Sequence, residues 1–239
     1  FSPWGNVKND LSPANIGQRA GELVQVSAEY GLGIAGLATN MAADELDDVR
    51  SVAEACAEHG IPCFRLGAPR RYRAEENYRQ LIDDTIKSFE KALEITRPLK
   101  VKCILEIHRG TVACSASQAY LVVKNFDPDY LGVIFDIANM SLGEGYEPVT
   151  MGLDLLGPYV AHVHAGGGRP VEGERREDGQ LTWKWETCDL ADSMIDVPHF
   201  LAALRARGYN RFVSIEDFRP QPVEDKLGRQ LGFLRAALG

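Results

Sequence analysis

Residues 101–140 read VKCILEIHRGTVACSASQAYLVVKNFDPDYLGVIFDIANM and contain a strand, a helix and a second strand in succession. The apolar runs at 101–108 and 130–140 have the length and the residue types of buried strands. The helix between them is opened by Ser115 with Gln118 three residues later, which is the pattern of a capping box. Two buried strands joined by a helix predict a parallel βαβ unit.

The same alternation continues on both sides of this unit and predicts one α/β domain over residues 1–239. A doubly wound open sheet is the alternative architecture. The first strand-to-helix turn contains no G-x-G-x-x-G, and the chain contains no G-x-x-x-x-G-K-[ST], so the nucleotide-binding versions of that sheet are disfavoured. The remaining strands are predicted at 32–39, 61–67, 159–165 and 211–218, and the remaining helices at 12–31, 42–60, 74–95, 148–157, 198–207 and from about 222.

The composition excludes several classes of partner. The chain has 239 residues, 45% of them hydrophobic, and a formal net charge of −8, which argues against binding to a nucleic-acid backbone. It shows no apolar run near the ~20 residues of a membrane span and no secretory leader. Its five cysteines are irregularly spaced, as expected for reduced thiols in a cytoplasmic protein. We therefore expect a cytoplasmic protein with a small-molecule substrate and neither a nucleic-acid nor a membrane partner.

Polar side chains end four successive predicted strands. Side chains alternate across a strand, and α/β proteins place their active sites at the C-terminal ends of parallel strands. We therefore expect these side chains to meet at one point and to bind a metal ion. Three carboxylates and one imidazole suit Mn²⁺ or Mg²⁺ better than a structural zinc, although Co²⁺, Fe²⁺ and Zn²⁺ remain open. The four residues are Glu106, Asp136, His164 and Glu216.

Two histidines compete for the position on the strand at 159–165. Both His162 and His164 would point inward, one layer apart along the strand. His164 is nearer the C-terminal end and is therefore assigned as the ligand. His162 would lie one layer below, level with Ser214, as a packed histidine that orients its neighbours by hydrogen bonds.

Four motifs, in this order, resemble the sugar-phosphate isomerase/epimerase group of the xylose isomerase-like TIM barrels: LEIH at 105–108, FDIANM at 135–140, AHVHAGGG at 161–168 and SIEDF at 214–218. The resemblance implies a TIM (β/α)8 barrel in which these motifs end strands five to eight. Counting backwards makes 32–39 the third strand, and residues 1–10 then resemble the loop after the second strand. We therefore expect a barrel without its first two strands. The group's metal ligands correspond to Glu106, Asp136, His164 and Glu216.

The resemblance also implies substrate contacts. The family's D-x-x-[HN] turn matches Asp136 and Asn139, so Asn139 would face the substrate. His108 lies where family members contact substrate, and Arg169 is the counterpart of an arginine that binds substrate oxygens. The epimerases commonly have His where this chain has Asn139. Many members also have a Lys-Asp or Gly-Glu pair where this chain has AGGG, so the specific substrate stays open.

The expected activity is that of a metal-dependent isomerase or epimerase acting on a sugar, keto-sugar or polyol. A divalent ion would polarise a hydroxy-ketone and stabilise an enediolate, while Glu106 and Glu216 act as the acid–base pair. A buried salt bridge, for instance with Lys102 or Arg65, is the alternative interpretation of these two glutamates.

Other functions are also considered. If a β-hydroxyl leaves, the reaction is a dehydration of an inosose-like substrate by a dehydratase or lyase. An inactive barrel used as a binding subunit is a further alternative. A phosphodiesterase acting on abasic DNA is disfavoured because the chain is acidic and has only five histidines.

The polar stretch at 166–195 is long for a strand-to-helix loop. Trp183 and Trp185 are two residues apart, so on an extended segment they would face the same way. They would line either a lid or a contact between subunits, and a homo-oligomer is therefore among the expected partners.

Overall fold

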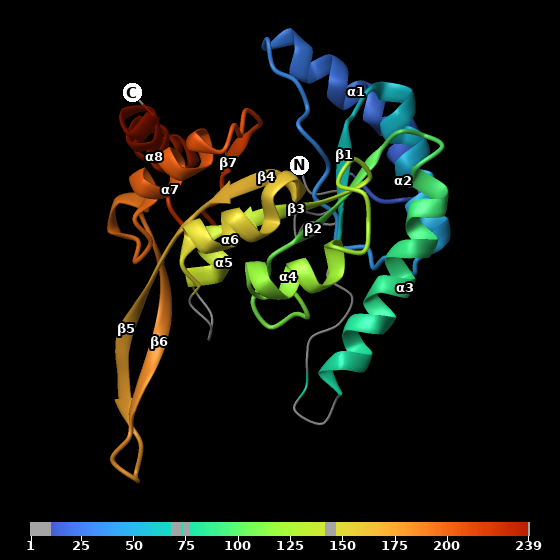
Figure 1. Cartoon of the computed structure of the whole chain (residues 1–239). Helices are drawn as coiled ribbons and strands as arrows, with labels where there is room; N and C mark the ends of the chain where they lie inside the picture. Colours follow the sequence, from blue (N-terminus) through green and yellow to red (C-terminus); the bar gives the residue numbers. More distant parts are fainter. Residues whose placement is uncertain (1–10, 68–72, 74–76, 142–146, 239) are drawn as a thin grey trace.

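A computed structural model of the chain describes residues 11–67, 73, 77–141 and 147–238. In it, five parallel strands form the central sheet (Figure 1). The strand order is β1-β2-β3-β4-β7, and each strand is parallel to its neighbour. This is the sheet of an α/β barrel that stays open, because β1 and β7 stand at opposite ends of the strand order. The strands are β1 (Cys63–Leu66), β2 (Lys102–Glu106), β3 (Leu131–Asp136), β4 (Val160–Ala165) and β7 (Val213–Ile215).

Helices cover the outer face of the sheet, and the main hydrophobic core lies between the two layers. Phe64 and Phe135 point outward from their strands into this core, where Phe135 stacks on Phe200 with ring centroids 5.5 Å apart. Among the described residues, no helix is both long enough and apolar enough to cross a lipid bilayer. The helices are α1 (Ile16–Glu29), α2 (Leu46–His59), α3 (Tyr78–Thr96), α4 (Ala116–Val123), α5 (Ile137–Ser141), α6 (Val149–Leu156), α7 (Val197–Ala206) and α8 (Val223–Leu238), with short 3₁₀ turns η1 (Gly157–Tyr159) and η2 (Leu190–Asp192).

The inner face of the sheet has a much smaller apolar cluster. Ile104, Ile134 and Ala161 come from three neighbouring strands and pack together, with Cys63 beside them. A cavity of about 550 Å³ lies over this face and is bounded by residues 32–38 on one side and 214–218 on the other. The alternation expected for a barrel strand is therefore present, with outward side chains in the core and inward side chains lining a cavity.

The strand predicted at 32–39 is wrong in extent. Only isolated parallel bridges, Leu37 with Phe64 and Ala42 with Gly67, join this region to β1 and the loop after it. The Leu37 N–H donates to the Cys63 carbonyl at 3.0 Å, so the segment does run beside β1. A Cβ on Gly36 would lie 2.7 Å from Cys63 Sγ, so the close approach of the two segments needs glycine at this position. Because glycine also weakens a strand, regular pairing between residues 32–39 and β1 is short.

Two helix starts differ in how well they were predicted. The first helix begins at Ile16 rather than near Ser12, because Asn15 accepts a hydrogen bond from the Ser12 N–H at 2.7 Å and closes a turn before the helix. The Ser115 cap is confirmed, since its hydroxyl accepts from the Gln118 N–H at 3.3 Å. Residues 74–76, where α3 was expected to begin, lie outside the described residues.

The polar stretch after β4 forms a long hairpin rather than a loop. Strands β5 (Gly167–Arg175) and β6 (Leu181–Cys188) pair antiparallel and project from the body of the molecule, as Figure 1 shows. This pairing was not predicted, although the expectation of an extended segment carrying the two tryptophans is compatible with it.

Candidate metal centre

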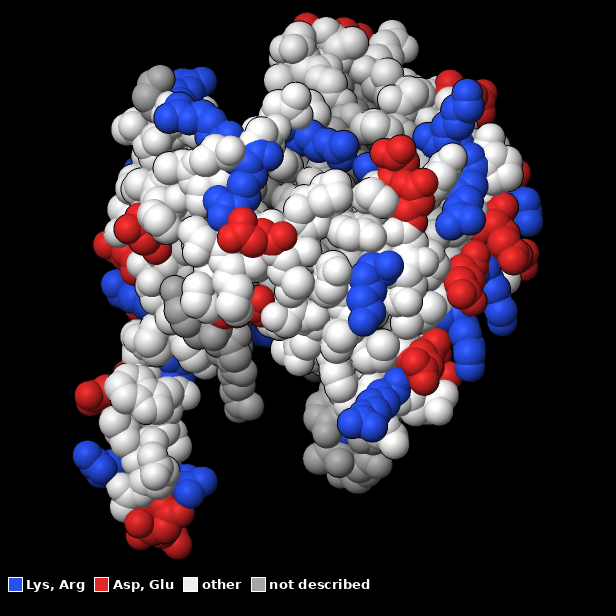
Figure 2. All heavy atoms as spheres, viewed as in Figure 1, with Lys and Arg blue, Asp and Glu red and all other residues white. Residues whose placement is uncertain are grey.

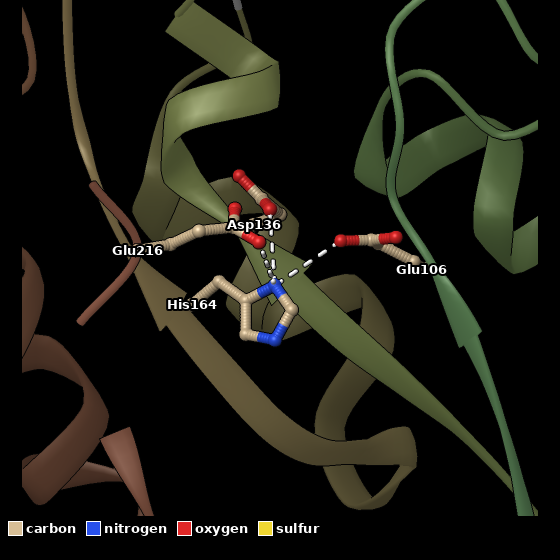
Figure 3. A group of neighbouring side chains, drawn as sticks. All are labelled: Glu106, Asp136, His164 and Glu216. Carbon is tan, nitrogen blue, oxygen red and sulfur yellow. Dashed lines mark hydrogen bonds and ion pairs between the residues drawn. The ribbon is translucent and has the colours of Figure 1, made fainter. Parts of the chain in front are cut away.

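Four side chains converge at the C-terminal ends of the strands (Figure 3). Each offers one atom that could hold a metal ion, and these atoms all lie within 4.8 Å of one another. Three of the residues are buried, and the fourth, Glu216, is half-buried just beyond the end of β7. The group consists of Glu106, Asp136, His164 and Glu216, the residues that the sequence predicted to meet.

The strand register explains why four different strands can reach one point. Asp136 pairs directly with His164, but Glu106 pairs with Ile134, and His164 pairs with Ser214. The two glutamates are therefore offset along their strands from the central pair, as expected from the stagger of strands in a barrel. Each glutamate spans this offset with a side chain that is one methylene longer than aspartate.

His164 stands at the centre of the group. Its Nδ1 lies 3.1 Å from Glu106 Oε1, 3.2 Å from Asp136 Oδ2 and 3.6 Å from Glu216 Oε1. Burial opposes a charge on the ring, but the hydrogen bonds to Asp136 and Glu106, together with the nearby Glu216, outweigh it and raise the pKa of His164 to about 10. Three carboxylates thus act on one imidazole nitrogen.

The two glutamates of the group experience opposite environments. Burial raises the pKa of Glu106, but its hydrogen bond to His164 and its ion pair with Arg65 outweigh burial, so the net pKa is below its usual value. No arginine among the described residues forms an ion pair with Glu216. Burial and the neighbouring Asp136 raise the pKa of Glu216 to about 7, against the opposing effect of His164.

Arg65 is the main residue beside the site for which the sequence predicted no functional role. The sequence considered it only as a salt-bridge partner, and it does pair with Glu106. Its Nε donates to the Thr39 carbonyl and its Nη2 donates to Asn40 Oδ1, both at 2.7 Å. A charged residue on the inward face of the run at 61–67 is the pattern from which this position could have been found.

His162 lies one layer below, as predicted. Its Nε2 is 2.7 Å from Ser214 Oγ, and its ring meets the ring of His164 edge to face with centroids 5.4 Å apart. Burial and the charge of His164 lower the pKa of His162 to about 4. It is therefore a neutral histidine bound to a serine.

The three residues predicted to contact substrate lie in different settings. Asn139 is buried in α5 and its backbone N–H donates to Asp136 Oδ1 at 2.6 Å. His108 follows β2, donates from Nδ1 to the Arg109 carbonyl at 2.9 Å, and contributes to lowering the pKa of Glu106. Arg169 is exposed on β5, where it forms an ion pair with Glu186 at 2.5 Å and stands outside the converging group.

Comparison with known proteins identifies relatives. The model of the family described as "Xylose isomerase-like TIM barrel" matches residues 3–237. An inosose dehydratase of Geobacillus kaustophilus is 28% identical over 194 residues, which are 72% of this chain and 61% of that protein. The chain thus spans less than two thirds of the length of this curated relative.

Solved structures share the fold at low sequence identity. An L-ribulose 3-epimerase structure superposes with a TM-score of 0.73 at 17% identity, covering 100% of this chain and 82% of that one. A xylose isomerase-like TIM barrel protein from Mycobacterium smegmatis in complex with magnesium gives a TM-score of 0.71 at 15% identity, covering 96% and 81%.

Proposed function

The chain belongs to the xylose isomerase-like TIM barrel family, and from this membership and the geometry of the site we propose that it is a divalent-metal-dependent isomerase or epimerase. Its substrate would be a sugar, keto-sugar or polyol. The observation on which the proposal rests is the convergence of three carboxylates and one imidazole at the C-terminal ends of the barrel strands. Active sites of α/β barrels lie at this end of the barrel.

The chemistry of the donor set fits a divalent cation. Three buried or half-buried carboxylates share one histidine, and a buried charge is costly unless it is paired. The pKa of Glu216, raised to about 7, and that of His164, raised to about 10, express the same excess of negative charge. A cation held by Glu106, Asp136, His164 and Glu216 would offset that excess.

The same donors also support a proposal for the identity of the metal. Oxygen-rich sites with one imidazole suit Mn²⁺ or Mg²⁺, and we propose Mn²⁺ first because the imidazole adds a nitrogen ligand. Co²⁺, Zn²⁺ and Fe²⁺ are accepted by the same ligand types and form the comparison set for a binding experiment.

The proposed reaction is proton transfer next to a carbonyl. A bound divalent cation would polarise the carbonyl of a hydroxy-ketone and stabilise the negative charge that develops on its oxygen. Glu106 from β2 and Glu216 after β7 come from opposite sides of the converging group. One would remove the proton and the other would return it. Arg65 holds Oε2 of Glu106, which leaves Oε1 directed at His164.

Substrate contacts are assigned to Asn139, His108 and Arg169. Asn139 lies immediately beside Asp136, and His108 lies close to Glu106, so both flank the proposed metal site. Arg169 would have to exchange its ion pair with Glu186 for a substrate oxygen. The inner-face cavity of about 550 Å³, lined in part by His164 and Glu216, provides room for a monosaccharide-sized ligand.

Dehydration is the second candidate because the curated relative matched by this chain is an inosose dehydratase. The same proton removal would be followed by departure of a β-hydroxyl, which the second glutamate would protonate so that it leaves as water, instead of return of a proton to carbon. The two outcomes differ in product, and both use the same residues of the site.

The test is an activity screen on ketoses and inososes with metal-stripped protein, with and without added Mn²⁺. We expect Mn²⁺-dependent conversion of at least one substrate, and deuterium from the solvent in the position next to the carbonyl. Conversion that is unaffected by metal removal would contradict the proposal. Turnover without any deuterium incorporation would instead favour a hydride shift over proton abstraction.

A further inference from the structure

The hairpin β5–β6 contributes none of the four converging site residues, but it exposes an apolar side chain and a strand edge that a partner could contact. Trp183, near its outer part, is 57% exposed, a large apolar side chain left in solvent. Isolated two-stranded ribbons are marginally stable, and an exposed regular edge invites a further strand. On the face seen in Figure 2, the projecting part carries both basic and acidic side chains.

The pairing register sorts the hairpin into two faces. Trp185 pairs with Pro170 and Trp183 pairs with Glu172, so both tryptophans lie on the same face. Lys184 and Glu186 lie on the opposite face, where Glu186 pairs across the hairpin with Arg169.

The outer edge of β5 is closed to another strand. Near its base, the Gly168 carbonyl accepts from the Met194 N–H at 2.9 Å, so residues beyond β6 already cover this edge. Pro170 has no N–H to offer, and the register shifts between Glu172 and Arg175. Coverage by neighbouring residues, a proline and an irregular register are features that protect an edge strand from pairing with a further strand.

Among the described residues, none of these features protects the outer edge of β6. Its sequence, LTWKWETC at 181–188, contains neither proline nor glycine and is rich in strand-forming residues. Gly168 directs its carbonyl away from β6, so its partner Thr187 also directs its backbone groups away from β5. Along a strand, every second residue directs its backbone groups to the same side. The N–H and C=O groups of Trp185 and Trp183 therefore also point away from β5, along the outer edge of β6.

We propose that β6 pairs antiparallel with β6 of a second copy of this chain, with the two Trp185 residues opposite each other on the two-fold axis. This register places Lys184 opposite the partner subunit's Glu186, and the symmetry repeats the contact. It also places Trp183 opposite the partner subunit's Thr187. Opposite charges facing each other across an antiparallel pair stabilise it, whereas like charges destabilise it.

The partner of the β6 edge is a second copy of this chain because the edge is complementary to itself. The order Lys-Trp-Glu at 184–186 becomes Glu-Trp-Lys when the strand is reversed, so each charge meets its opposite only in this register. Two hairpins would form a four-stranded sheet with the tryptophans of both copies on one face. The added apolar burial and the backbone hydrogen bonds would stabilise an arm that otherwise stands alone in solvent.

Sedimentation equilibrium of the whole chain, as wild type and charge variants, tests the proposal. We expect a dimer for the wild type, and at least ~10-fold weaker association for Lys184→Glu and for Glu186→Lys, since each places like charges opposite each other in both symmetric contacts. The double variant Lys184→Glu/Glu186→Lys should restore the dimer. Glu172→Lys, the same change on β5, is the matched control and should leave it intact.

A cysteine scan tests the register separately. Under oxidation, Trp185→Cys should cross-link to itself across the axis, whereas Thr187→Cys should not, because its two copies stand far apart along the strands. A monomeric wild type at high protein concentration would overturn the proposal. So would a dimer unaffected by both charge reversals, or cross-linking at position 187 in place of 185. These results are independent of metal binding and activity, so they leave the proposed function unaffected.

Discussion

Two successive layers of side chains inside the open barrel, one around His164 and one around His162, differ strongly in charge although they are adjacent. The upper layer contains His164 among three carboxylates, and the lower layer contains His162, which is hydrogen-bonded to Ser214 and pairs with Ile134. The two histidines are on one strand with rings 5.4 Å apart. The pKa of the upper one is raised to about 10, and that of the lower one is lowered to about 4.

The neighbouring strands create this difference. Around His164, β2, β3 and the end of β7 each supply a carboxylate, whereas His162 pairs with Ile134 on β3 and is hydrogen-bonded to Ser214. Burial lowers the pKa of both imidazoles, and only the upper one is offered enough negative charge to reverse the effect. A shift of two residues along a strand therefore separates a charged cluster from a neutral packing layer.

The largest expected effect comes from neutralising one glutamate of the upper layer. Glu216→Gln keeps the shape but removes both the charge and the base, so turnover should fall by ~10²–10⁴-fold, the range for a lost general acid or base. Steady-state kinetics at saturating Mn²⁺ measures it. Glu172→Gln, the same change at an exposed site on β5, is the control. Near-full recovery of Glu216→Gln by Mn²⁺ would restrict Glu216 to holding the metal.

Arg65 supports the upper layer from the side of β1. Arg65→Gln leaves Glu106 without its cationic partner, and loss of a residue that orients a metal ligand typically costs ~10–100-fold in metal affinity or activity. Mn²⁺ affinity and kcat should therefore fall within this range, while Arg65→Lys should recover part of the loss by keeping the charge. Equal losses in the Gln and Lys variants would show that the geometry of the guanidinium, and not its charge, supports Glu106.

The pH dependence of metal binding should report the proton on His164. With its pKa raised to about 10, His164 is protonated at neutral pH, and Nδ1 must release that proton before it can bind a cation. Mn²⁺ affinity should therefore weaken as pH falls, by up to about tenfold per pH unit. Calorimetric titrations in buffers of different ionisation enthalpy would detect the released proton. An affinity independent of pH between 6 and 8 would remove His164 from the ligand set.

The smallest effect concerns the lower layer and acid stability. Because the pKa of His162 is about 4 in the folded chain, below the ordinary value of 6.5, the unfolded chain binds the extra proton first. This contribution therefore lowers stability as pH falls from about 6.5 towards 4 and has no effect above that window. Urea unfolding of His162→Asn at several pH values should show a shallower loss on acidification than the wild type. An unchanged slope would mean that His162 does not titrate in this window.

The convergence of the four side chains could be predicted from the sequence in more detail than the strand pairing around them. Alternation along strands and the position of strand ends placed Glu106, Asp136, His164 and Glu216 together, because both rules are local to the sequence. The same rules predicted that His162 is level with Ser214; the two side chains do form a hydrogen bond, although the strand register pairs Ser214 with His164.

The features that were missed depend on pairing between distant segments. The hairpin β5–β6 is specified by cross-strand register within a charged stretch that has no strong period of its own. Arg65 acquires its role from Thr39 and Asn40, which lie about 25 residues earlier in the chain. The short pairing at 32–39 depends on a close approach to Cys63, which the apolar pattern does not reveal.

The central claim is that the upper layer binds a divalent cation and the lower layer does not. Calorimetric titration of Mn²⁺ into metal-stripped wild type, His164→Asn and His162→Asn tests it with one substitution at two positions of the same strand. We predict one site in the wild type, little change in His162→Asn, and loss of measurable binding in His164→Asn. Equal weakening by both substitutions, or wild-type affinity in His164→Asn, would contradict the claim.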